Sequence, residues 1–110
     1  MAYDEDLANR LRDLLADEDG VTEKKMFGGL AFLVRGNMSV SASGKGGLLA
    51  RIDPADTDAA LARPHVTRME MRGKEMDGWL RVSGDAVADD DALQRWVEVG
   101  TSYAAGLPPK

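Results

Sequence analysis

Residues 30–52 read LAFLVRGNMSVSASGKGGLLARI. Within this stretch, residues 38–43 alternate Met, Val and Ala with serine, which is the period of a half-buried β-strand. The apolar run at residues 30–34 precedes that strand across an Arg-Gly-Asn turn, and residues 48–52 follow it across a glycine-rich turn. The stretch therefore predicts three consecutive antiparallel strands joined by short turns.

Helices are predicted before and after these strands in the sequence. The first, over residues 4–17, is indicated by apolar residues at helical spacing: Tyr3, Leu7, Leu11, Leu14 and Leu15. Asp53-Pro54 predicts the start of a short helix over residues 54–62, because an acid suits the N-cap and proline suits the first helical position. A third helix is predicted from the acids at residues 89–91 to the prolines at residues 108–109. Its apolar face consists of Leu93, Trp96, Val97, Gly100, Tyr103, Ala104 and Leu107.

Two further strands are predicted at residues 66–71 and 79–82, the second entered through Gly78, and residues 22–27 are a candidate for an additional leading strand. The resulting order is α-β-β-β-α-β-β-α, with runs of strands between helices rather than regular alternation. This order predicts a single α+β domain over residues 1–110. We expect two layers, with an antiparallel sheet packed on the N-terminal, short central and C-terminal helices.

Charge is segregated along the chain. No Asp or Glu occurs from Lys24 to Ile52, and this window carries the cations Lys24, Lys25, Arg35, Lys45 and Arg51. The chain as a whole is acidic, with 19 acids against 14 Lys and Arg and a net charge of −5. Because the acids concentrate in the predicted helices and at their ends, we expect a basic sheet layer and an acidic helical layer.

The composition excludes several classes of protein. The chain has 44% hydrophobic and 30% charged residues and no cysteine, which fits a globular domain and leaves no disulfide or thiolate metal site. The acidic N-terminus lacks the features of a secretory signal, and the longest apolar run, at residues 30–34, is too short for a membrane helix. We therefore expect a cytoplasmic protein. The acidic balance also argues against binding nucleic acid by bulk charge.

Several segments carry a family resemblance. YDEDLA at residues 3–8 and VTEKKMFGGLAF at residues 21–32 resemble the TfoX/Sxy N-terminal domain family, as do GNM at 36–38, MDGW at 76–79 and YAAGLPPK at 103–110. The resemblance implies a bacterial two-layer α+β fold related to that of secretion chaperones. It also implies kinship with regulators of natural competence, which act in transcription with the cAMP receptor protein.

Those regulators carry a second, C-terminal helical domain, whereas this sequence ends at Lys110. We therefore expect a stand-alone N-terminal domain. The resemblance supplies no catalytic residues to transfer.

The run KKMFGG at residues 24–29 has two readings. Two ammonium groups beside an exposed Phe27 and flexible glycines would suit an anionic ligand or nucleic acid. Alternatively, Met26 and Phe27 enter the core, the glycines form a bulge or turn, and the lysines protect a sheet edge from pairing. The structural reading is favoured, because glycine in a strand most often marks a bulge.

The remaining motifs carry weak chemical signals. SGKGG at residues 43–47 lacks the Ser or Thr and the helix that follow the lysine of a phosphate loop, so a hairpin turn is predicted. His65 is the only histidine, so a loop residue is expected rather than an acid–base or metal site. The acids at residues 17–19 and 89–91 lack the ligand spacing of a calcium loop. We therefore predict no enzyme, no catalytic residues, no metal and no cofactor.

A period of two divides the strand residues between the two faces of the sheet. The residues predicted to point inward, toward the helices, are Leu30, Phe32, Val34, Met38, Val40, Ala42, Leu48, Ala50, Ile52, Leu80 and Val82. Those predicted to point outward are Ala31, Leu33, Arg35, Ser39, Ser41, Leu49, Arg51, Trp79 and Arg81. Trp, Leu and Arg suit an interface, but scattered apolar residues on a solvated face are also normal, so both readings stay open here.

The candidate interaction face combines the outward set with the basic window: Lys24, Lys25, Leu33, Arg35, Leu49, Arg51, Trp79 and Arg81. From it we predict a non-enzymatic regulatory or protein-interaction module that acts through a protein partner. A homodimer through this face is the preferred specific hypothesis. The alternative is direct binding of nucleic acid or an anionic ligand through the basic face, and no membrane partner is expected.

Overall fold

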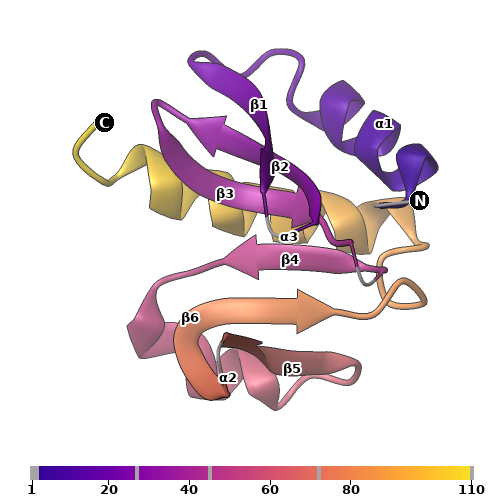
Figure 1. Ribbon diagram of the computed structural model, residues 1–110, viewed down its shortest axis with the longest axis vertical. Helices are drawn as coiled ribbons and strands as arrows, with labels where there is room; N and C mark the ends of the chain where they lie inside the picture. The colour runs from indigo at the N-terminus through magenta and orange to yellow at the C-terminus, as the bar shows by residue number, and fades with distance from the viewer. Residues whose placement is uncertain (1–2, 27, 45, 72, 110) are drawn as a thin grey trace.

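The computed structural model describes residues 3–26, 28–44, 46–71 and 73–109 (Figure 1). Six strands form one antiparallel sheet in the order β1-β2-β3-β4-β6-β5, and the helices pack against one face of it. The elements in chain order are α1 (Glu5–Leu14), β1 (Val21–Met26), β2 (Gly29–Val34), β3 (Asn37–Ala42), β4 (Leu48–Arg51), η1 (Pro54–Asp56), α2 (Thr57–Leu61), β5 (Val66–Met71), β6 (Lys74–Val82) and α3 (Asp90–Ala105). Within these described ranges, every helix is too short or too polar to cross a membrane.

The predicted α+β architecture is confirmed, with differences at the ends of elements. The candidate leading strand exists as β1, which pairs with β2 along its whole length. α1 ends at Leu14 rather than at residue 17, and the short central helix divides into the 3-10 turn η1 and the helix α2. β6 begins at Lys74, so Gly78 lies inside that strand rather than at its entrance. Gly78 has a φ of +81°, and an added Cβ would lie 2.8 Å from the Ile52 carbonyl oxygen, so glycine is required where β6 passes the end of β4.

The main hydrophobic core lies between the helices and the sheet. α1 contributes Leu7 and Leu11, and the Asp4 carboxylate caps its N-terminus by accepting hydrogen bonds from two backbone N–H groups. α3 approaches the sheet so closely that a Cβ on Gly100 would lie 2.8 Å from the Ser39 carbonyl oxygen. This glycine therefore lets α3 pack directly on β3.

One residue predicted to point toward the helices lies on the other face of the sheet. Met38, which was expected to point toward the helices, lies in a cluster on the opposite face of the sheet. Phe32 pairs with Val40 while Leu33 pairs with Met38, so Ser39 is an extra residue in β3, a β-bulge. Because side chains alternate along a strand, one extra residue moves the side chains before it to the other face.

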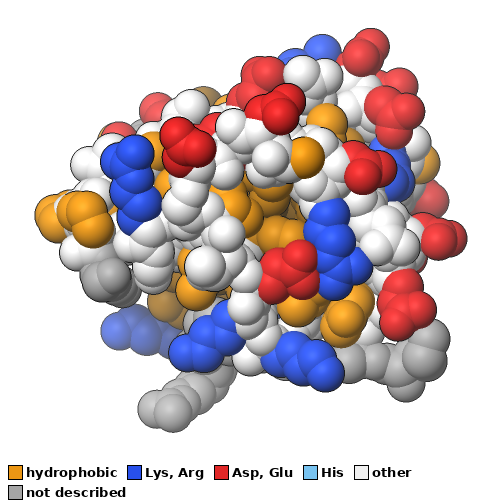
Figure 2. All heavy atoms as spheres, turned by 90° about the horizontal axis from the view of Figure 1, so that it is seen from above, with side chains coloured by type: hydrophobic (Ala, Val, Ile, Leu, Met, Phe, Trp, Pro, Cys, Tyr) orange, Lys and Arg blue, Asp and Glu red, His pale blue; other side chains and the backbone are white. Residues whose placement is uncertain are grey.

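The predicted charge layers hold only for the centre of the sheet. Arg51 is the sole charged residue of β2, β3 and β4, but β1 includes Glu23, and β5 and β6 include Glu70, Glu75 and Asp77. In the view from above in Figure 2, Lys and Arg side chains gather along the lower margin, which is the side that faces the viewer in Figure 1. Acidic side chains occupy the upper and right margins. The sheet is therefore basic at its centre and mixed in charge toward both edges.

Candidate interaction surface

The face of the sheet opposite the helices, called the outer face below, is defined by the strand register. Ala31, Ser41 and Leu49 lie directly opposite one another on β2, β3 and β4, and Lys24 and Arg81 continue the row on β1 and β6. The three central residues lie on the predicted face, but they are buried, with Leu49 only 2% exposed. The outer face is therefore not an ordinary solvated sheet face at its centre.

A cluster of apolar side chains on the outer face explains this burial. The outer-face cluster consists of Ala31, Leu33, Met38, Leu49, Met69 and Trp79. Leu33 and Trp79 are only partly buried and form its exposed side, whereas the other four are buried. Most apolar side chains on this face therefore stabilise the fold, and Leu33 and Trp79 supply the apolar surface that remains for a partner.

The buried serines of β3 are hydrogen-bonded within the sheet. The Ser39 hydroxyl donates to the Phe32 carbonyl oxygen at 2.8 Å, and the Ser41 hydroxyl donates to the Leu30 carbonyl oxygen at 3.0 Å. Each bond satisfies a polar group that would otherwise be costly to bury. These hydroxyls therefore serve the packing of β2 and β3 rather than the binding of a ligand.

Arg51 lies close to two aromatic rings. Its Cζ lies 5.0 Å from the ring centroid of Trp79, which pairs with it across β4 and β6, and 5.5 Å from the ring centroid of Tyr103 on α3. Cation–π contact with the two rings restrains the guanidinium. Within the part of the chain that the structure describes, Arg51 forms no ion pair with a carboxylate.

Two more cations flank this position. Arg81 lies on the neighbouring row of the outer face, and its Nη1 donates to the Ser43 hydroxyl at 3.0 Å. Lys24 is exposed on the edge strand β1. Arg81, like Arg51, is partly buried and has no ion pair among the described residues. The outer face thus presents uncompensated positive charge beside partly exposed apolar side chains.

Two residues of the predicted interaction face lie elsewhere. Lys25 pairs with Leu30, whose side chain is in the main core, so Lys25 projects from the opposite side of the edge strand β1. Arg35 is exposed in the turn between β2 and β3, where its φ is +50° and its backbone N–H donates to the Gly20 carbonyl oxygen at 2.9 Å. The structure therefore groups Lys24, Leu33, Leu49, Arg51, Trp79 and Arg81 on one face. Phe27 was predicted either to be exposed beside the lysines or to enter the core, and it lies outside the described residues.

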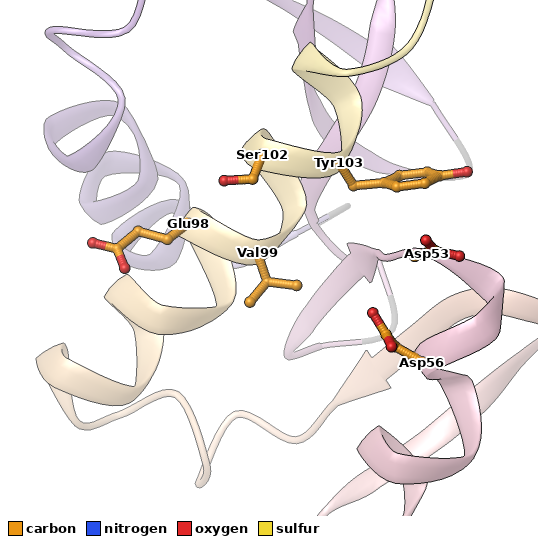
Figure 3. Close-up of a pocket in the computed structure, with 6 residues that line it drawn as sticks. All are labelled: Asp53, Asp56, Glu98, Val99, Ser102 and Tyr103. Atoms are coloured by element: carbon orange, nitrogen blue, oxygen red, sulfur yellow. The ribbon is translucent and has the colours of Figure 1, made fainter.

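A groove runs along the helical side of the molecule, between η1 and α2 on one wall and α3 on the other. Two hollows of about 450 and 310 Å³ share Asp56 and Val99 and so form one continuous helix groove. Its lining residues are Ile52, Asp53, Asp56, Ala59, Ala60, Arg63, Trp96, Glu98, Val99, Ser102 and Tyr103. Figure 3 shows Val99 and Tyr103 on α3 facing Asp53 and Asp56 on the opposite wall.

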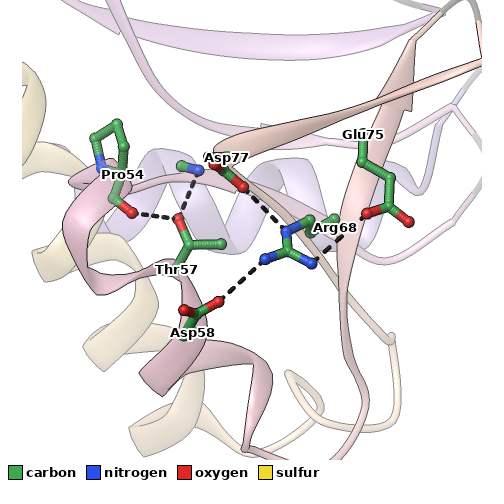
Figure 4. Close-up of polar contacts among 7 residues, drawn as sticks. Pro54, Thr57, Asp58, Arg68, Glu75 and Asp77 are labelled. Atoms are coloured by element: carbon green, nitrogen blue, oxygen red, sulfur yellow. Dashed lines mark hydrogen bonds and ion pairs between the residues drawn. The ribbon is translucent and has the colours of Figure 1, made fainter.

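Polar contacts hold the η1 and α2 wall of this groove against the sheet (Figure 4). The buried Thr57 hydroxyl donates to the Pro54 carbonyl oxygen at 2.7 Å and accepts from the Gly78 N–H at 2.8 Å. Arg68 of β5 joins α2 to the sheet, because its Nη2 lies 3.1 Å from an Asp58 oxygen. Its Nε lies the same distance from an oxygen of Asp77 on β6.

The described residues offer little catalytic or metal-binding chemistry. No group of three or more His, Asp or Glu among them could hold a metal ion, and none of their buried side-chain polar atoms lacks a partner. His65 lies exposed in the loop before β5, as predicted. The Arg12 guanidinium lowers the pKa of Glu23 through hydrogen bonds of 2.8 and 2.9 Å, which tie α1 to β1. The lowered pKa of Glu23 therefore reflects a structural ion pair with Arg12 and does not by itself indicate a functional site.

These features define a small α+β domain in which one antiparallel sheet carries helices on one face and an amphipathic surface on the other. The model of the TfoX N-terminal domain family matches residues 13–104, and the chain belongs to that family. The family is of a regulatory type and is not a known enzyme family. No curated protein and no solved structure matches the chain.

Proposed function

We propose that the protein is a non-enzymatic regulatory module that binds an acidic segment of a partner protein through its outer face. The observation that carries this proposal is Arg51, which is partly buried, contacts two aromatic rings and has no carboxylate partner among the described residues. Family membership supports a regulatory role of the kind found in competence regulators. The proposed site consists of Lys24, Leu33, Arg51, Trp79 and Arg81.

The stacked arginine suits a carboxylate partner for a physical reason. The aromatic rings take none of the conventional hydrogen bonds of the guanidinium, so its N–H groups keep the capacity to bind a carboxylate through two parallel hydrogen bonds. Because the rings of Trp79 and Tyr103 already restrain Arg51, less side-chain entropy is lost on binding. The exposed parts of Leu33 and Trp79 would contact an apolar residue next to that carboxylate.

Charge favours a different protein over a second copy of this chain. A symmetric dimer through the outer face would bring the same surface of two copies together, so Arg51 and Arg81 would oppose like charges. We therefore do not propose a homodimer, and the test below includes it as one possible outcome. Direct nucleic-acid binding is the second candidate, because cations beside Trp79 resemble a surface on which a base could stack. The net charge of −5 opposes it.

The test uses the whole chain and a panel of synthetic peptides in which Asp or Glu flanks one aromatic or aliphatic residue. Binding is followed by NMR chemical shifts and by titration. We expect shifts at Leu33, Arg51 and Trp79, and binding weakened about tenfold or more by Arg51→Gln, since a charged hydrogen-bonded pair is lost. The matched control is Arg95→Gln, which removes a cation from an exposed position of α3.

Three results would overturn the proposal. Peptide binding that is equal in the Arg51→Gln and Arg95→Gln variants would remove the role of the stacked arginine. A single-stranded DNA probe that binds more tightly than any peptide, with an affinity that falls steeply with salt, would favour the nucleic-acid alternative. A concentration-dependent dimer in sedimentation that Leu33→Glu abolishes would assign the face to a second copy.

A further inference from the structure

The helix groove is a second surface, which adjoins the outer face at Tyr103, and its most exposed apolar side chain is Val99. Val99 is 45% exposed, and it is one of only two large hydrophobic residues classed as exposed in the described part of the chain. Ala59 and Ala60 continue the apolar lining beside it, whereas Trp96 and Ile52 are almost fully buried. The two helical walls are fixed, because Thr57 ties one of them to β6 and α3 packs directly on β3. A pre-formed apolar groove between helices is the kind of site that receives an amphipathic helix.

The lining residues at the two ends of this groove carry charges of opposite sign. Asp53, Asp56 and Glu98 line the end nearest Tyr103, and none of them forms an ion pair among the described residues. Glu98 accepts a hydrogen bond from Gln94 Nε2 at 3.3 Å, and Figure 3 shows its side chain directed away from the two aspartates. At the other end, the Cζ of Arg63 lies 5.4 Å from the ring centroid of Trp96. The acidic end is therefore open to a cation from a partner, and the Arg63 end disfavours one.

We propose that the helix groove binds a basic amphipathic helix of a partner protein. An apolar side chain of that helix packs on Val99, and its Lys or Arg residues face Asp53, Asp56 and Glu98. Arg63 fixes the direction of the helix, because the end that lies near it carries no cation. This inference rests on the carboxylates of the groove, although Tyr103 joins the groove to Arg51 of the outer face.

The probe is a synthetic amphipathic peptide of about 18 residues with leucine on one face and lysine on the other, and its control replaces every lysine with glutamate. Binding to the whole chain is measured by fluorescence anisotropy. We expect the lysine peptide to bind and the glutamate peptide to bind at least about tenfold more weakly, because its charges would face acids.

Matched variants separate this groove from general attraction to an acidic protein. The double variant Asp56→Asn with Glu98→Gln is expected to weaken the lysine peptide about threefold to tenfold. The double variant Asp85→Asn with Asp91→Asn removes the same charge from exposed positions outside the groove, and less than about a twofold change is expected. Val99→Arg is expected to weaken binding about tenfold or more, because it adds a like charge at the apolar centre.

Shifts at Ala59 and Ser102 in the unsubstituted protein supply a readout that does not depend on any variant. Arg81→Gln, which changes the outer face, is expected to leave binding of the lysine peptide unchanged. The proposal is overturned if the two double variants weaken binding equally, if shifts occur away from α2 and α3, or if the peptide fails to bind at about 1 mM.

Discussion

The substitution Thr57→Val is predicted to destabilise the domain through a single buried amide. Valine has nearly the shape of threonine, so no cavity opens, but the hydroxyl that accepts from the Gly78 N–H at 2.8 Å is lost. Thr57 is 2% exposed and Gly78 is buried, so water does not replace that bond freely. The Pro54 carbonyl oxygen keeps a partner, because it still accepts from the backbone N–H of residue 57. The cost is therefore that of one unsatisfied buried donor, about 1–3 kcal/mol.

A loss of this size is measurable in a domain of 110 residues. The melting temperature is expected to fall by roughly 4–12 °C, and the urea midpoint to fall with an unchanged slope. Hydrogen exchange at the Gly78 amide should become faster. Thr57→Ser keeps the hydroxyl and should lose at most about 1 kcal/mol. Thr22→Val, on an exposed position of β1, serves as the surface control. The reasoning is refuted if Thr57→Val unfolds at the same urea concentration as Thr57→Ser, or if Gly78 exchange is unchanged.

Three further predictions concern packing and pH. Gly100→Ala should destabilise the fold by roughly 1–3 kcal/mol in urea unfolding, because the added Cβ would press on β3. The control Gly84→Ala adds a carbon with no non-neighbouring atom within 4 Å, and it should change stability by less than about 0.5 kcal/mol. Leu49→Ala should cost about 2–5 kcal/mol in the same assay if the outer face has a buried cluster, and a cost typical of a surface residue would contradict the burial described here. The folded pKa of Glu23 lies below its unfolded value of 4.5, so its pair with Arg12 stabilises the fold above that pH and is lost as the pH falls below it. Glu23→Gln should therefore reduce the loss of stability between about pH 5 and 3 in acid titrations, and an unchanged pH profile would exclude this contribution.

The sequence was sufficient to predict elements whose side chains follow one period throughout. The serine alternation located β3 and the leucine spacing located α1, because a sheet face or helix stripe leaves its period in the sequence. The placement of single side chains was less accurate, since Met38 lies on the other face of the sheet and Leu14 is exposed. The order of elements followed from these periods and from the turns between them. Gly78 was misread as the entrance to β6, because its role comes from the close passage of the Ile52 carbonyl oxygen and not from its neighbours in the sequence.

The site was less accessible to prediction, because its geometry depends on contacts between distant segments. The bulge at Ser39 changed the face of Met38, and an inserted strand residue leaves no distinct composition. Met69 joined the outer-face cluster from a strand whose alternation is weak. Tyr103 was assigned to the apolar face of its helix, and only the structure shows that its ring also contacts Arg51.

Burial on both faces of the sheet changes which side chains count as evidence for a partner. An antiparallel sheet with helices on one side commonly leaves its other face to solvent, where a large apolar residue calls for an explanation. Here Leu49 is buried by its neighbours on that face, so folding alone accounts for it. Folding accounts only in part for Arg51 and Arg81, whose contacts within the fold are aromatic rings and the Ser43 hydroxyl. Among the described residues neither arginine has a carboxylate partner, and an ion pair would reduce the cost of keeping a cation partly buried. The case for an acidic partner therefore rests on the two arginines, and substitutions of the buried residues Met38, Leu49 and Met69 on the same face would report on stability instead of binding.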